Sequence, residues 1–94
     1  MNENEYPKMS HEDAIQHCRY WAKTIREDGI DILTHDAGAV SISDQLCYPL
    51  EMQEWITPED YPILHAITVY AVRADNDYTD KDAWEKIVQL TDLL

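Results

Sequence analysis

The side chains that most often perform catalysis or bind metal ions are few here: four histidines and two cysteines among 94 residues. Two histidines that share a metal ion on one helix stand four positions apart, whereas His11 and His17 stand six apart. His65 lies in an apolar stretch, as a core or boundary histidine does. His35 adjoins a turn, and no second ligand stands at a spacing that would complete a site. We therefore expect neither a metal site nor a cofactor.

The two cysteines, Cys18 and Cys47, have neither redox nor zinc-site spacing. Cys18 follows His17 directly, but neighbours on a helix point about 100° apart, so these two cannot pair as nucleophile and base. A pairing of Cys47 with a distant histidine stays open. We expect both thiols to be free and Cys18 to be buried. The chain also has only two glycines and no phosphate-binding glycine loop, so we expect that it is not an enzyme.

Charge is the most informative property of this chain. Nineteen acidic and seven basic residues give a formal net charge of −12 at pH 7. No Lys or Arg occurs between Arg26 and Arg73, a window that contains many acids. Such a field disfavours binding to nucleic acid or an anionic membrane and favours association with a basic protein. The alternative is that these acids only keep the surface solvated and stabilise helix N-termini.

Two aromatic residues of this base-free window, Tyr48 and Trp55, lie in its least regular part. Trp and Tyr are enriched at the energetic centres of protein interfaces because they bury large areas while keeping a polar tip. Trp55 is our first choice as an anchor and Tyr48 the second. The predicted partner-binding residues are Asp36, Asp44, Tyr48, Glu51, Glu54, Trp55, Glu59 and Asp60.

Three pairs of a capping residue and an acid three positions later predict three helix starts. The pairs are Ser10 with Asp13, Thr57 with Asp60, and Thr79 with Asp82. Gly29 is suited to end the first helix.

The stretch 63–74 is nearly all apolar, which predicts a central helix that is buried on all sides. Pro62 conflicts with a start at Thr57 and leaves Asp60 or Tyr61 as alternative caps. Apolar residues at helical spacing from Ala83 to Leu94 predict the last helix.

Residues 30–56 are ambiguous. Alternating apolar and polar residues permit a short β-hairpin or extended segment at 30–43. An irregular loop followed by a helical turn from Ser43 or Asp44 is the other interpretation, and Pro49 is expected to interrupt any long helix. The predicted fold is therefore mainly α: a small bundle of three main helices around a central apolar helix. One domain spans 10–94, preceded by a flexible tail at 1–9.

In size and charge, although in no motif, the chain is similar to small acidic DNA-mimic inhibitors used by phages and mobile elements. We expect a cytoplasmic, non-enzymatic protein that inhibits a basic partner, one that handles nucleic acid. An immunity or antitoxin protein against one toxin, or a small helical adaptor subunit, are the alternatives. There is no apolar run near 18 residues and no apolar signal-peptide core, so we expect no membrane span.

Overall fold

The computed structural model describes residues 8–94; residues 1–7 of the predicted tail lie outside the described part. Within it the chain is mainly helical and contains no strand, which confirms the predicted fold class. The elements, in chain order, are α1 (His11–Asp28), α2 (Ile30–Leu33), the 3-10 turn η1 (Ala37–Ala39), α3 (Val40–Glu51), α4 (Pro62–Asn76) and α5 (Lys81–Thr91).

Helix α1 begins and ends where the sequence indicates. The Ser10 side chain accepts a hydrogen bond from the Asp13 backbone N–H, and the Asp13 side chain accepts one from the Ser10 N–H. This reciprocal pair satisfies two amide groups that the first helical turn leaves free. At the other end Gly29 has φ +90°, a backbone conformation that residues with a Cβ rarely adopt.

The prediction of a hairpin or extended segment at 30–43 is wrong. Gly29 leads directly into α2, and η1 then joins α2 to α3, which begins at Val40 rather than at Ser43 or Asp44. The buried residues of this region explain the helix. Ala39, Ser43 and Leu46, followed by Cys47 and Leu50, repeat at three and four positions, which is helical and not strand periodicity.

Pro49 does not interrupt α3, contrary to our expectation. It lies inside the helix, which continues to Glu51. Proline removes one backbone N–H and crowds the preceding turn, but only two helical residues follow it here. The helix therefore loses little by containing it and ends soon afterwards.

The predicted start of α4 at Thr57 is also wrong. The N-cap is Tyr61, one of the two alternatives, and Pro62 occupies the first turn of the helix. Proline is favoured there because that position has no intrahelical partner for an N–H. The Thr57 hydroxyl instead accepts a hydrogen bond from the Asp60 N–H and so closes a turn ahead of the helix.

Helix α5 is capped one residue later than predicted. Asp80, and not Thr79, accepts the hydrogen bond from the Ala83 N–H at 3.1 Å. Thr79 is engaged outside the helix, where its N–H and hydroxyl both donate to Asp77. Because Thr and Asp are both good N-caps, adjacent candidates cannot be ranked by residue type alone.

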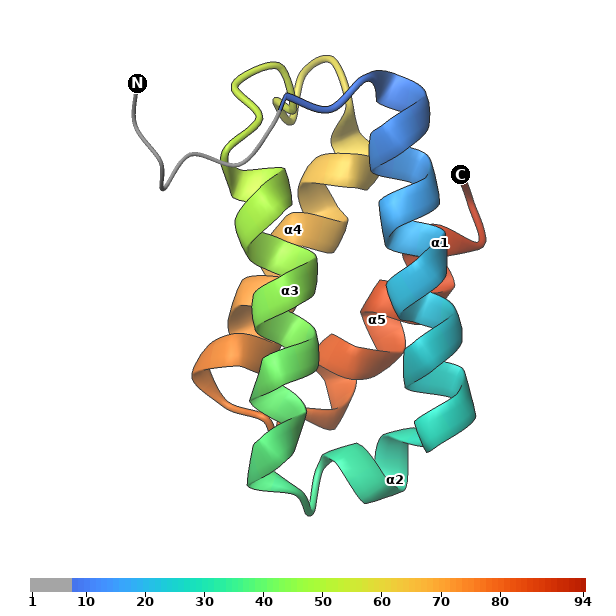
Figure 1. The fold of residues 1–94 in the computed structure, drawn as a ribbon, viewed down its shortest axis with the longest axis vertical. Coiled ribbons are helices and arrows are strands. Elements are labelled where there is room, and N and C mark those ends of the chain that lie inside the picture. The colour runs from blue at the N-terminus through green and yellow to red at the C-terminus, as the bar shows by residue number, and fades with distance from the viewer. Residues whose placement is uncertain (1–7) are drawn as a thin grey trace.

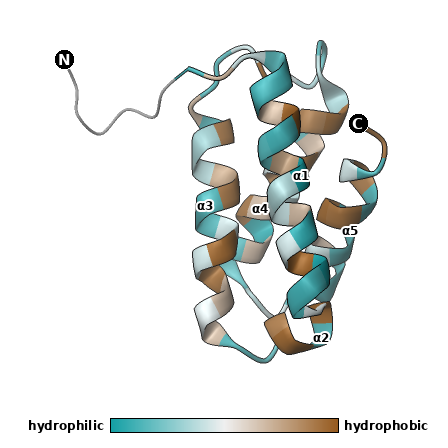
Figure 2. Ribbon diagram, turned by 45° about the vertical axis from the view of Figure 1, so that its right-hand side comes forward, coloured by the Kyte–Doolittle hydropathy of each residue, from teal (hydrophilic) through white to brown (hydrophobic). Residues whose placement is uncertain are grey.

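Helix α4 packs against both α3 and α5, while α1 contacts all three of these helices (Figure 1). The interior is apolar, and along α3 most hydrophobic residues lie toward the neighbouring helices (Figure 2). The largest fully buried side chain is Trp84, whose indole N–H donates to the Tyr78 carbonyl.

Burial of α4 is one-sided rather than complete. Leu64, Ile67, Ala71 and Ala74 form its buried face, whereas Val69 is 43% exposed. The expected burial on all sides is therefore wrong. The helices packed against α4 leave part of its surface exposed.

Candidate partner-binding surface

Three of the eight predicted site residues form one stripe on α3. Asp44, Tyr48 and Glu51 are separated by four and three positions, so they follow one another along the same helix face. Tyr48 is 39% exposed, and Glu51 is exposed as well. The stripe lies on the side of α3 that borders α4.

The structure adds a fourth residue, Asp75 of α4, to this stripe. The Tyr48 hydroxyl donates to Asp75 Oδ2 at 3.3 Å, and the Ser43 hydroxyl donates to Asp75 Oδ1 at 3.2 Å. The sequence gives no signal for Asp75, because this residue follows Arg73 and so lies outside the base-free window. Only the antiparallel packing of α4 on α3 brings it beside Tyr48. We call Asp44, Tyr48, Glu51 and Asp75 the acidic face.

The two aspartates of the acidic face interact directly. A hydrogen bond between the Asp44 and Asp75 carboxyl groups raises the pKa of Asp44, and partial burial and the Asp75 charge act in the same direction. A hydrogen bond between two carboxyls needs a proton on one of them. Above that pKa both groups are charged and repel, which favours a cation placed between them.

Neighbouring groups respond to the same negative field. The charges of Asp75 and Asp44 raise the pKa of the Tyr48 hydroxyl, which stays protonated and able to donate. Burial, reinforced by Asp75, Glu51 and Asp44, raises the pKa of the Cys47 thiol to about 12. A thiol with that pKa is almost entirely protonated near neutral pH and is a poor nucleophile.

The remaining predicted acids lie at the two ends of α3. Asp36 precedes η1, and its carboxylate accepts a hydrogen bond from the Gly38 N–H. Glu54, Glu59 and Asp60 are exposed in the segment between α3 and α4. The predicted residues therefore follow the length of α3 and its connections rather than surround one pocket.

Trp55 is engaged within the protein. Its indole N–H donates to the Met9 carbonyl at 3.1 Å, and its ring packs edge-on against Tyr61 with centroids 4.9 Å apart. The His11 ring also packs against Tyr61, with the two ring centroids 5.2 Å apart. Met9 also donates its N–H to Gln53, so this aromatic cluster holds residue 9 of the predicted tail against the domain.

The charges of residues 8–94 are segregated in space. Five ion pairs occur in this part of the chain, and their acids are Asp31, Asp80, Asp82, Glu85 and Asp92. None of the six predicted site acids, nor Asp75, belongs to an ion pair among these residues. Every acid of α3 and its connections thus lacks an ion pair in this part of the chain, as do five further acids elsewhere: Glu12, Asp13, Glu27, Asp28 and Asp77.

A shallow depression of about 310 Å³ continues the acidic face toward the start of α4. Its lining residues are Leu50, Glu51, Gln53, Ile56, His65 and Thr68. The depression combines apolar side chains with one carboxylate, a composition that suits the alkyl stem and charged tip of a lysine or arginine.

The cysteines and histidines that could perform chemistry have structural surroundings. Cys18 and Cys47 are free and buried, which confirms the prediction for Cys18, and burial raises the pKa of Cys18 to about 12. The His17 imidazole bonds to the Leu46 carbonyl. Among residues 8–94, no three His, Cys, Asp or Glu side chains are arranged to hold a metal ion.

No helix of the described chain combines the length and apolar character needed to cross a membrane. Comparisons of the sequence with protein-family models and curated proteins, and of the fold with solved structures, gave no match. Function is therefore inferred from the surface of the molecule.

Proposed function

We propose that this protein is a non-enzymatic inhibitor that binds a basic, nucleic-acid-handling protein in the cytoplasm through its acidic face. The observation that supports this is the segregation of charge. The acids along α3 have no basic partner within residues 8–94, while Arg73 of α4 and Lys81 of α5 pair with other acids. Uncompensated like charges cost stability, which a binding role would justify.

In the proposed complex, carboxylates stand where the partner otherwise holds phosphates. Lys or Arg side chains of the partner approach Asp44 and Asp75 and relieve the repulsion between them. Tyr48 is the central anchor because it is half-exposed and its hydroxyl is already oriented by Asp75. Trp55 moves to a supporting role because its indole N–H holds Met9.

Affinity capture from a host lysate tests the proposal with three baits: the wild type, Glu51→Lys/Glu54→Lys, and the control Glu27→Lys/Asp28→Lys. The two acids of the control are exposed at the end of α1. Both double variants change the net charge by the same amount. We expect one basic nucleic-acid-binding protein on the wild-type and control baits, its loss from the Glu51→Lys/Glu54→Lys bait, and its displacement by added duplex DNA.

Two outcomes would overturn the proposal. Capture of a single toxin that DNA does not displace would support the immunity or antitoxin alternative. Equal capture by all three baits would mean that the acidic face is only a solvated surface, as in the adaptor alternative.

A further inference from the structure

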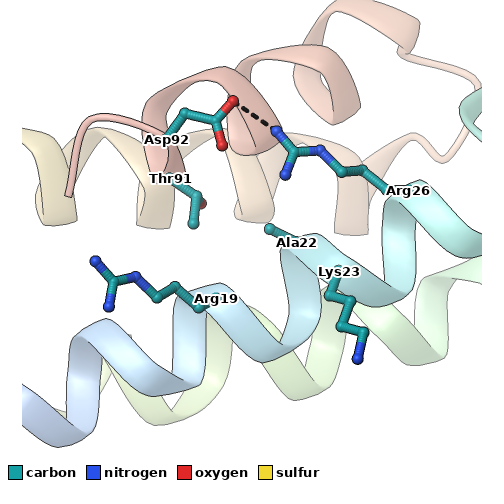
Figure 3. A pocket seen from close by; sticks show the side chains of 6 residues that line it. All are labelled: Arg19, Ala22, Lys23, Arg26, Thr91 and Asp92. Carbon is teal, nitrogen blue, oxygen red and sulfur yellow. Dashed lines mark hydrogen bonds and ion pairs between the residues drawn. The ribbon is translucent and has the colours of Figure 1, made fainter.

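A basic stripe lies on the other side of the bundle. Arg19, Lys23 and Arg26 of α1, three of the seven basic residues in the chain, border a depression of about 340 Å³ beside the end of α5 (Figure 3). Ala22 of α1, Thr91 at the end of α5 and Asp92, the C-cap of α5, complete the border. We call Arg19, Lys23 and Arg26 the basic stripe.

The cations of the basic stripe are only partly neutralised. Arg26 forms an ion pair with Asp92 at 2.5 Å, and both side chains are more than half exposed. Arg19 donates to the main-chain oxygen of Leu94 at 3.3 Å. Lys23 is exposed and forms no ion pair within the described residues. The residues that line the depression thus include three bases and one acid, on a molecule whose net charge is −12.

The basic stripe and the acidic face have matching dimensions. Arg19, Lys23 and Arg26 are separated by four and three positions, as are the three α3 residues of the acidic face. With a rise of about 1.5 Å per residue, each set extends roughly 10 Å along its helix. The basic stripe borders the end of α5 and the acidic face borders α4, and no ion pair joins the two surfaces within residues 8–94.

We propose that the basic stripe of one copy docks on the acidic face of a second copy. Such a contact is heterologous, because the two copies contribute different surfaces, and it therefore builds rings or open chains. The same contact covers Tyr48 and Asp75, so self-association competes with any partner of the acidic face. This inference goes beyond the proposed function and holds whether or not an external partner exists.

Long-range repulsion between two copies at −12 opposes this contact, but its range is short in salt. The Debye length is about 8 Å at physiological ionic strength, so distant charges are screened while charges in contact still attract. Assembly should therefore be weaker in very dilute buffer and also weaker at high salt. That dependence distinguishes complementary charged patches from apolar aggregation.

Sedimentation velocity tests the proposal with Lys23→Glu, which disrupts the basic stripe, and Glu51→Lys, which disrupts the acidic face. At physiological ionic strength the wild type should form oligomers between micromolar and millimolar concentrations. Each variant alone should associate about tenfold more weakly or worse. Mixed in equal amounts they should form a heterodimer, because each retains the surface that the other has lost.

Lys86→Glu is the matched control, since it makes the same charge change on α5 at a residue that does not line the depression. It should assemble like the wild type, apart from a small effect of net charge. A wild type that is monomeric throughout, a mixture that forms no heterodimer, or a Lys86→Glu defect equal to that of Lys23→Glu would each overturn the inference.

Discussion

Tyr48 and Trp55 have different relations to the core, although both lie in the stretch without basic residues. Tyr48 contacts Asp75 at the surface, whereas Trp55 holds Met9 and packs against Tyr61. An exposed aromatic contributes to binding when a partner covers it, but a packed one contributes to folding first.

Tyr48→Ala should therefore weaken partner binding by about 2 kcal/mol, mainly through a faster off-rate, and change stability by less than about 1 kcal/mol. Trp55→Ala should instead destabilise the fold by about 2–4 kcal/mol because it empties a packed site and leaves a backbone carbonyl without its donor. Urea denaturation and surface plasmon resonance measure the two effects separately. Equal losses of stability in both variants would refute this division.

The Asp44–Asp75 pair predicts a particular pH dependence of stability. The pKa of Asp44 is raised in the folded state above its ordinary value of 3.8. The folded protein then holds a proton that the unfolded chain has already released, so this contribution to stability is complete below 3.8 and is lost as the pH rises through the raised pKa.

Asp44→Asn should remove that dependence, because an amide donates to Asp75 at every pH. The variant should be more stable than the wild type near pH 7, and the advantage should disappear in acid. Urea denaturation of both proteins between acid and neutral pH provides the comparison. A difference in stability that does not change with pH would contradict the assigned interaction.

The helix boundaries show which local signals could be read without the structure. Ser10 and Gly29 were predicted correctly, because the capping box and the glycine at positive φ have no competing neighbour. Thr57 and Thr79 were wrong because a better-placed residue follows each: Pro62 fixes the start of α4, and Asp80 gains an ion pair with Arg73.

The full extent of helix α3 was not predicted, and this matters more than the cap positions because α3 carries most of the candidate surface. Short apolar alternation at 30–43 resembles a strand, and only the longer repeat through Leu50 reveals a helix. The sequence indicated Asp44, Tyr48 and Glu51 as candidates. It was insufficient to identify Asp75, because a contact 27 positions away from Tyr48 depends on how α4 packs.

Substitutions can test the assigned helix starts by comparing Asp80, the N-cap of α5, with Thr57, which precedes α4 without capping it. Asp80→Ala should cost about 1–2 kcal/mol, because it removes the hydrogen bond to the Ala83 N–H and the ion pair with Arg73. Thr57→Ala should cost less, since it removes only a turn contact with Asp60. Thermal denaturation followed by circular dichroism compares them, and a larger loss for Thr57→Ala would show that the assigned caps are wrong.

Considered together, the helices separate two charged surfaces of opposite sign. The basic residues of α1 border α5, and the acids of α3, none of which forms an ion pair among the described residues, follow that helix toward α4. The interior shows no unsatisfied buried side-chain donor or acceptor among the described residues. One of the hydrogen-bond partners of these buried groups belongs to the acidic face, since the buried Ser43 hydroxyl donates to Asp75.

The central claim is that position in the structure, rather than net charge, determines which acids bind the partner. Glu51 and Glu27 are both exposed, lie in the same base-free stretch and have no ion pair within residues 8–94, but only Glu51 belongs to the acidic face. The most direct test is the association rate of the captured partner with Glu51→Lys and Glu27→Lys at low and high salt. Glu51→Lys should slow association about threefold to tenfold at low salt and less at high salt, whereas Glu27→Lys should change it by less than about twofold. Equal slowing by both substitutions would contradict the account, because it would mean that only the total charge of the protein matters.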